Sequence, residues 1–195
     1  YDARTVIALT GKEIKDRKYI PTVLGASVKE LLENNLSEDV PVRIISGNVL
    51  TGTRIEADGY MSFYERQVTG IREGIEPELF GWLIPKPDKF SISRALPSWF
   101  MRQVGKVQYD LDTNSHGELR AFVVSGQYEE VFPFDIFPVQ LLKAIMNQDI
   151  EAMEKLGLYE VVEEDCALCE VVCTSKISVQ NIVRDGLELL RSELG

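Results

Sequence analysis

The sequence predicts an α+β chain in which a strand-rich region is followed by a small C-terminal helical domain. Short β-branched and apolar runs, bounded by glycine or proline, recur between residues 5 and 124, whereas apolar residues after Val131 recur at helical spacing. The composition fits a folded chain, since 45% of the residues are hydrophobic and 27% are charged. These observations exclude a chain dominated by disorder.

The first element group contains two strands, a helix and a third strand. We predict strands at residues 5–9, 19–24 and 40–45, with Pro21 favouring either an edge position or a strand start for the second. Between the second and third of these strands, Ser27 and Glu30 have the spacing of a capping box, which indicates a helix that ends near Asn34. Residues 46–52 have the pattern of a glycine-punctuated turn. This order is the layout of a β-grasp module, which we predict over residues 1–58.

Residues 59–130 form the predicted strand-rich connecting region. Apolar and aromatic runs indicate strands at residues 61–64, 67–71, 80–84, 90–93 and 121–124. A polar stretch at residues 110–117 is typical of a surface loop. The chain has one histidine, His116, which lies in that loop and is expected to be solvated.

Residues 131–195 form the predicted C-terminal helical domain. Apolar spacing indicates a helix at residues 139–146, and a second helix is expected to begin at the capping residue Asp149 and end at Gly157. The amphipathic stretch from Val179 to Leu194 predicts a final helix. The acidic run at residues 163–165 would be favourable at a helix N-terminus.

All three cysteines, Cys166, Cys169 and Cys173, fall between the last two helices. Their spacing matches the last three cysteines of the iron–sulfur pattern C-x2-C-x2-C-x3-C-P, but Glu163 stands at the first position and Thr174 replaces the proline. A cluster needs more thiolates, and a structural zinc site needs four ligands. In a helix the three thiols would share one face, so packed thiols at vestigial cluster positions are one interpretation and metal ligands the other.

Other parts of the sequence give no catalytic or cofactor-binding residue. The net charge of −10 argues against binding nucleic acid or an anionic membrane surface through bulk electrostatics. Carboxylates are scattered, and the glycine patterns at residues 10–12, 46–48 and 51–53 indicate turns rather than phosphate loops. No apolar run approaches the roughly 20 residues of a membrane-spanning helix. Three cysteines without a secretory spacing suit a reducing compartment, and thiols are expected in preference to a disulfide.

Seven aromatic residues are candidates for a quinone path or a docking surface. Core packing is the alternative interpretation for most of them. The seven are Phe80, Trp82, Trp99, Phe100, Phe132, Phe134 and Phe137.

Several stretches together resemble the A subunit of the bacterial Na+-translocating NADH:quinone oxidoreductase. They follow the order of that family and are spread over nearly the whole chain: TVLGAS (22–27), RIISGNVL (43–50), ELFGWL (78–83), KFS (89–91), PFDI (133–136) and EEDCALC (163–169). The position of Cys166 is often a leucine in that family, so the sequence departs from the family pattern there. With no Met at residue 1, we expect a C-terminal part of the subunit that lacks its N-terminal domains.

The resemblance implies a fold and a function. It implies a soluble-ligand-binding β-grasp (SLBB) domain, a connector and a degenerate iron–sulfur domain. It also implies a peripheral, cofactor-free accessory subunit on the cytoplasmic face of the inner membrane, near the quinone site, with the membrane-embedded subunits as partners. The complex would use NADH, flavins, iron–sulfur centres and ubiquinone to export Na+, while this chain would not itself be catalytic.

Two other function classes remain open. The cysteines of an electron-transfer subunit would bind an iron–sulfur cluster or another metal. A ligand-binding module would instead hold a small molecule on the β-grasp sheet.

Overall fold

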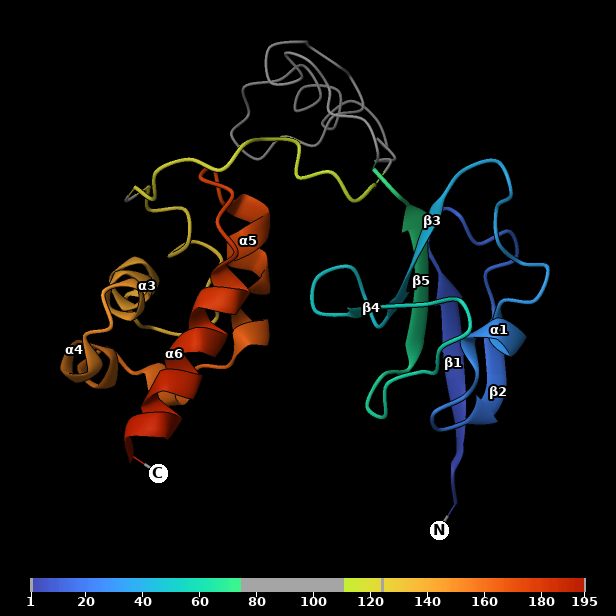
Figure 1. The fold of residues 1–195 in the computed structure, drawn as a ribbon, viewed down its shortest axis with the longest axis horizontal. Coiled ribbons are helices and arrows are strands. Elements are labelled where there is room, and N and C mark those ends of the chain that lie inside the picture. Colours follow the sequence, from blue (N-terminus) through green and yellow to red (C-terminus); the bar gives the residue numbers. More distant parts are fainter. Residues whose placement is uncertain (1, 75–110, 124, 195) are drawn as a thin grey trace. The chain divides into compact units, whose positions relative to one another are not determined.

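The computed structural model describes residues 2–74, 111–123 and 125–194, which divide into two compact units, residues 1–116 and 117–195 (Figure 1). The first unit is built on a five-stranded sheet and the second on helices. The mixed α and β character predicted from the sequence is therefore confirmed. The predicted strands at residues 80–84 and 90–93 lie outside the described residues, and the division at residues 58 and 130 stays a prediction.

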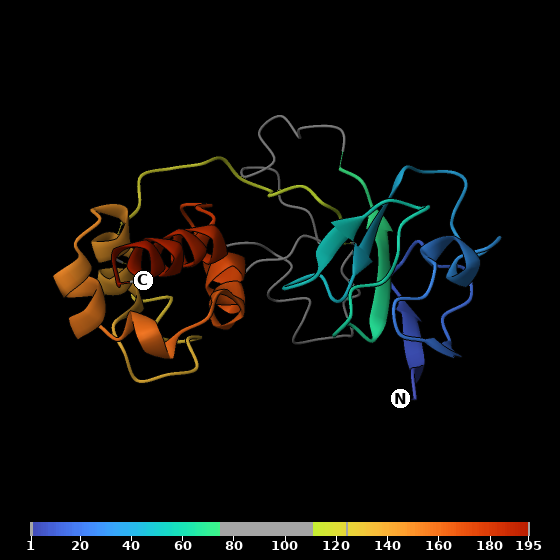
Figure 2. The same cartoon turned by 60° about the horizontal axis from the view of Figure 1, so that its bottom comes forward.

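The sheet of the first unit has the order β2-β1-β5-β3-β4. Its strands are β1 (Arg4–Thr10), β2 (Tyr19–Val23), β3 (Val42–Ser46), β4 (Thr53–Ile55) and β5 (Gln67–Arg72). β1 and β5 pair in parallel at the centre, and the other neighbours are antiparallel. The predicted edge position of β2 is thus confirmed (Figure 2).

One face of this sheet packs against helix α1 (Val28–Leu31). Alternation along β1 buries Ile7 and Leu9 on this face, at 1% and 2% exposure, where they join Val28 and Leu31 in one apolar cluster. The turn after β1 requires glycine, because Gly11 has φ +101° and a Cβ there would lie 2.1 Å from the carbonyl oxygen of Gly70. The turn predicted at residues 10–12 is therefore confirmed.

Two sequence predictions for the first unit are wrong, and one strand is missed. The capping box at Ser27 is absent, because the Ser27 side chain makes no cap hydrogen bond. The Val28 N–H, which is not part of a capping box, donates to the Gly59 carbonyl at 3.0 Å. Residues 61–64 are not a strand, because Met61 packs in the core and residues 63–64 form a turn. The missed strand is β4, which has only three residues and is held by its pairing with β3.

The second unit contains four α-helices and two short 3-10 helices within its described residues. The α-helices are α3 (Pro138–Met146), α4 (Ile150–Lys155), α5 (Ala167–Val172) and α6 (Val179–Leu194). The 3-10 helices are η1 (Leu158–Glu160) and η2 (Glu163–Cys166). The helices predicted at residues 139–146, 149–157 and 179–194 are confirmed to within a few residues. The strand predicted at residues 121–124 is wrong over its described part, residues 121–123.

Local chemistry sets the helix ends in this unit. The Asp149 carboxylate accepts a hydrogen bond from the Ala152 N–H at 3.0 Å, which confirms the predicted cap. Gly157 has φ +85°, the left-handed conformation that ends a helix. Among the described residues, no helix has both the length and the apolar content needed to cross a bilayer.

Candidate site at the buried cysteines

The three cysteines lie on the element pair η2 and α5. Cys166 ends η2, Cys169 lies within α5, and Cys173 follows its last residue. All three are free thiols with exposures of 3%, 0% and 2% respectively. The spacing i, i+3, i+7 therefore places them on the buried side of this segment.

The surroundings of the thiols are apolar apart from one hydroxyl group. The cysteines belong to the apolar cluster of the second unit, with Val139, Leu142 and Met153 among its buried members. The Tyr128 hydroxyl donates a hydrogen bond to Cys173 Sγ at 2.9 Å, and Tyr128 is only 2% exposed. The Tyr128 ring stacks on Phe122, with ring centroids 5.9 Å apart. Sequence reasoning missed Tyr128, because no local pattern connects it to a cysteine 45 residues away.

Burial favours the protonated form of two of the thiols, Cys166 and Cys169. Desolvation raises the pKa of Cys166 to about 12, with Cys169 and Asp165 adding repulsion. Desolvation also raises the pKa of Cys169 to about 12, and Glu129 is the next cause. The pKa of Tyr128 is raised by burial and by its bond to Cys173. Because the thiolate is the nucleophile, Cys166 and Cys169 are poorly suited to nucleophilic chemistry at neutral pH.

The residues present do not fit an iron–sulfur cluster. Glu163, at the first position of the cluster pattern, is held by Arg184 through two hydrogen bonds, from Nε at 2.9 Å and from Nη2 at 2.8 Å. Among the described residues, no group of three or more His, Cys, Asp and Glu side chains is arranged to hold a metal ion.

A second polar contact fixes α5 to α6. The Glu170 carboxylate accepts the Gln180 backbone N–H at 2.9 Å and the Gln180 side-chain amide at 3.0 Å. A carboxylate at this position satisfies a free N–H of the first helical turn and faces the positive end of the helix dipole. The cysteine segment is therefore tied to α6 at both Glu163 and Glu170.

The other residues singled out from the sequence do not join this site. His116 is about half exposed and its Nε2 lies 2.9 Å from Asp112 Oδ1, which agrees with a solvated loop residue. Among the candidate aromatics, Phe132 packs against the C-terminal core and contacts Phe134 edge to face, while Phe134 and Phe137 are exposed. The other four aromatics, Phe80, Trp82, Trp99 and Phe100, lie outside the described residues.

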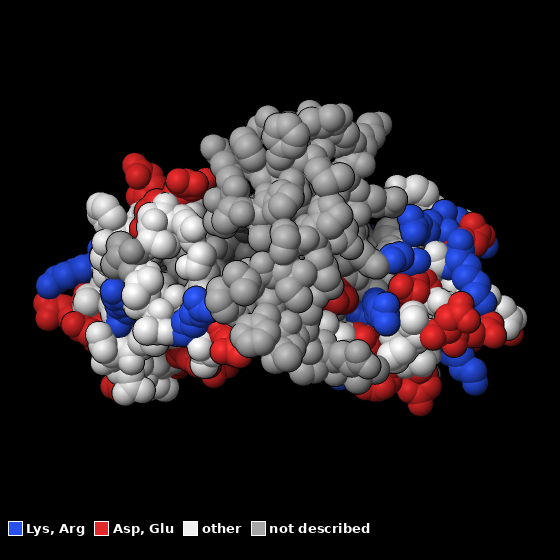
Figure 3. Space-filling model, turned by 90° about the horizontal axis from the view of Figure 1, so that it is seen from above, with Lys and Arg blue, Asp and Glu red and all other residues white. Residues whose placement is uncertain are grey.

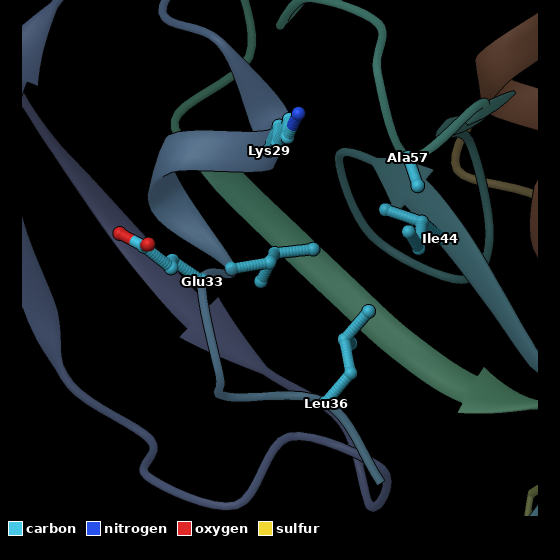
Figure 4. Close-up of a pocket in the computed structure, with 6 residues that line it drawn as sticks. Lys29, Glu33, Leu36, Ile44 and Ala57 are labelled. Carbon is cyan, nitrogen blue, oxygen red and sulfur yellow. The ribbon is translucent and has the colours of Figure 1, made fainter. Parts of the chain in front are cut away.

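A small apolar pocket opens beside α1 in the first unit. Its volume is about 230 Å³, below the roughly 300–1,000 Å³ of ordinary ligand sites. Leu32, Leu36, Ile44 and Ala57 line it, and the charged Lys29 and Glu33 lie at its rim (Figure 4). The pocket offers too little enclosed space and too few convergent polar groups to support a small-molecule function.

The surface charge of the first unit is mixed. On the face seen in Figure 3, Lys and Arg side chains are interspersed with Asp and Glu side chains. Several Lys and Arg side chains adjoin one another on the described part of that face, with Asp and Glu side chains next to them. The net charge of −10 argues against nucleic-acid binding through bulk electrostatics.

Comparison with known proteins gives a consistent result. Residues 6–57 match the family described as the NQRA C-terminal domain, whose model is the NQRA_SLBB model. A protein of Serratia proteamaculans (strain 568), named as the A subunit of the Na(+)-translocating NADH-quinone reductase, is 38% identical over 193 residues, which are 98% of this chain and 42% of that protein.

Two further relatives have the same name. The protein of Yersinia pestis bv. Antiqua (strain Angola) is 40% identical over 189 residues, which are 96% of this chain and 41% of the relative. The protein of Rhodopirellula baltica is 37% identical over 193 residues, which are 98% of this chain and 42% of the relative. The chain thus spans about two fifths of the length of the curated relatives it matches.

Proposed function

Because this chain is homologous over nearly its whole length to part of the A subunit of the Na(+)-translocating NADH-quinone reductase, we propose that it serves as a subunit of that reductase. The resemblance seen in the sequence is the one that the comparisons confirm. The identity of 38–40% over 96–98% of the chain is the observation that carries the proposal. The complex would oxidise NADH, reduce ubiquinone and export Na+.

We further propose that the first unit is a β-grasp domain of the SLBB type. Support comes from the family match over residues 6–57 and from the sheet order, in which a parallel central pair is flanked by antiparallel strands and packs on one helix. The connector and the degenerate iron–sulfur domain belong to the same proposal.

Within the complex, we propose that this chain is a cofactor-free accessory subunit. It would dock on the membrane-embedded subunits at their cytoplasmic side, near the quinone site. Two features support a role without a bound cluster: the three thiols are packed in an apolar core, and Glu163, at the first position of the cluster pattern, is paired with Arg184. The chain would contribute binding surface, and the redox chemistry would take place in its partners.

Co-purification tests this proposal. The tagged full-length protein, expressed in its own bacterium, should elute from detergent-extracted membranes together with the membrane subunits and NADH:quinone reductase activity. An untagged strain controls for non-specific retention. Elution of the tagged protein alone, from membranes that retain activity elsewhere, would contradict the assignment. Iron analysis of the anaerobically purified chain separates the cofactor-free role from an electron carrier, which would contain stoichiometric iron.

A further inference from the structure

The first unit exposes apolar side chains on the face of its sheet opposite α1. Cross-strand pairing places Val6 opposite Pro21, and Val23 opposite Arg4. Paired residues project from the same face, so the exposed residues form one continuous strip. Val6, Tyr19 and Val23 are 51%, 78% and 50% exposed, and Pro21 is exposed as well. We call Val6, Tyr19, Pro21 and Val23 the outer strip.

The sequence of β1 is typical of a strand that is covered on both faces. A strand with one solvated face alternates between apolar and polar residues, whereas Val6-Ile7-Ala8-Leu9 is a continuous apolar run. Ile7 and Leu9 lie on the face that packs against α1, whereas Val6 lies on the opposite face and is exposed. Further along the same face, Ile45 and Ile71 are only 7% and 6% exposed. The apolar residues of β3 and β5 on this face are therefore buried, whereas the outer strip on β1 and β2 is uncovered.

The edge of the sheet beside this strip is unsuited to accept another strand. β2 is an edge strand, and Pro21 at its centre has no backbone N–H to donate. A partner that adds a strand to this edge would lose a ladder hydrogen bond there. The occupant must therefore cover the face of the strip with apolar side chains.

We propose that the outer strip packs against the polypeptide that precedes this domain in the longer relatives. This inference rests on the proposed function. The relatives are more than twice as long as the matched region, and the matching family is a C-terminal domain, so that polypeptide joins at the N-terminal end of β1. That end lies beside the strip, because Arg4 pairs with Val23 (Figure 1). A tethered segment has a high effective concentration, which favours it over a separate protein or lipid.

Cysteine labelling of Val23→Cys tests the inference. The native thiols are buried, and the pKa values of Cys166 and Cys169 are raised, so an introduced surface cysteine reacts selectively with a fluorescent maleimide. The 195-residue chain should label rapidly at residue 23. In the isolated full-length protein, residue 23 should label at about one tenth of that rate or more slowly. Val6→Cys provides a second probe of the strip, and circular dichroism checks that each variant folds.

Glu30→Cys is the matched control, because Glu30 is exposed on α1, on the opposite side of the sheet. It should label at similar rates in both proteins. Equal labelling of residue 23 in both proteins would overturn the inference, as would protection that appears only in the assembled complex or only on addition of lipid vesicles. The labelling experiment uses the isolated full-length protein, whereas co-purification uses the assembled complex. Either experiment can therefore contradict its own proposal while the other experiment gives the expected result.

Discussion

At the scale of single residues, the Tyr128–Cys173 contact holds the loop before α3 against the cysteine segment. A thiol is a weak hydrogen-bond acceptor, so the aromatic ring contributes more to stability than the hydroxyl group does. The ring packs in the core and stacks on Phe122, while the hydroxyl has Cys173 Sγ as its partner.

We predict that Tyr128→Phe lowers the free energy of unfolding of the second unit by about 1 kcal/mol or less, because only one weak hydrogen bond is lost. Tyr128→Ala should cost about 3–5 kcal/mol, because it leaves a cavity in the core. Urea unfolding followed by circular dichroism measures both. A loss from Tyr128→Phe equal to that from Tyr128→Ala would show that the hydroxyl, and not the ring, holds this contact.

The buried thiols make the second unit sensitive to alkaline pH. The pKa of Cys169 rises from an ordinary value of 9.0 to about 12 on folding. Between these values the unfolded chain has lost the proton and the folded chain retains it, so stability is fully present below pH 9 and falls as pH rises. The slope for one thiol is at most about 1.4 kcal/mol per pH unit.

The free energy of unfolding, measured with urea, should therefore decrease between about pH 7.5 and about pH 10. This decrease should be smaller for Cys169→Ala than for the unsubstituted chain. The same comparison with Glu151→Ala, an exposed position on α4, controls for general alkaline effects. Identical losses in all three proteins would contradict the protonated, buried state of this thiol.

At the scale of elements, the crossing of α3 and α6 depends on a glycine. A Cβ at Gly186 would lie 2.9 Å from Ile145 Cγ2 and 3.0 Å from Ile145 Cγ1. These atoms belong to a β-branched side chain with few rotamers, so the side chain cannot easily move away. The close approach of the two helices at this point requires the absence of a side chain on α6.

We predict that Gly186→Ala does not stabilise the protein, although alanine favours a helix by about 1 kcal/mol over glycine. Overpacking costs about 1–3 kcal/mol, so the net result should be a loss of up to about 2 kcal/mol. In a double-mutant cycle, Ile145→Ala should reduce the cost of Gly186→Ala, since it removes the contacted atoms. Thermal unfolding measures all four proteins. A stabilised Gly186→Ala variant would show that the helices do not approach this closely.

The helices show how far local sequence information reaches. Apolar periodicity, the Asp149 cap and the Gly157 terminus lie within the segments that they define, so the sequence is sufficient to predict α3, α4 and α6. The Ser27–Glu30 spacing fits a capping box, yet the Ser27 side chain makes no cap hydrogen bond, and the neighbouring Val28 N–H donates to the Gly59 carbonyl, a tertiary contact outside the local pattern. The burial of the cysteines follows from their spacing, whereas their contact with Tyr128 depends on tertiary packing that no local pattern encodes.

At the scale of the whole molecule, each of the two units contains its own apolar cluster. The cluster of the first unit includes Leu9 and Val28, and the cluster of the second includes Leu142 and Met153. No described residue belongs to both clusters. Separate cores of this kind predict units that open independently, because each apolar cluster is built from the residues of one unit.

Matched core substitutions test this independence. Leu9 and Leu142 are 2% and 1% exposed, so replacement of either by alanine should cost about 2–5 kcal/mol. In native-state hydrogen exchange followed by mass spectrometry, Leu9→Ala should accelerate exchange in peptides from residues 2–74 and leave residues 125–194 unchanged. Leu142→Ala should give the reverse pattern. If either substitution accelerates exchange in both regions to the same extent, the chain unfolds as one cooperative body, because the free energy of opening would then be shared across the boundary between the units.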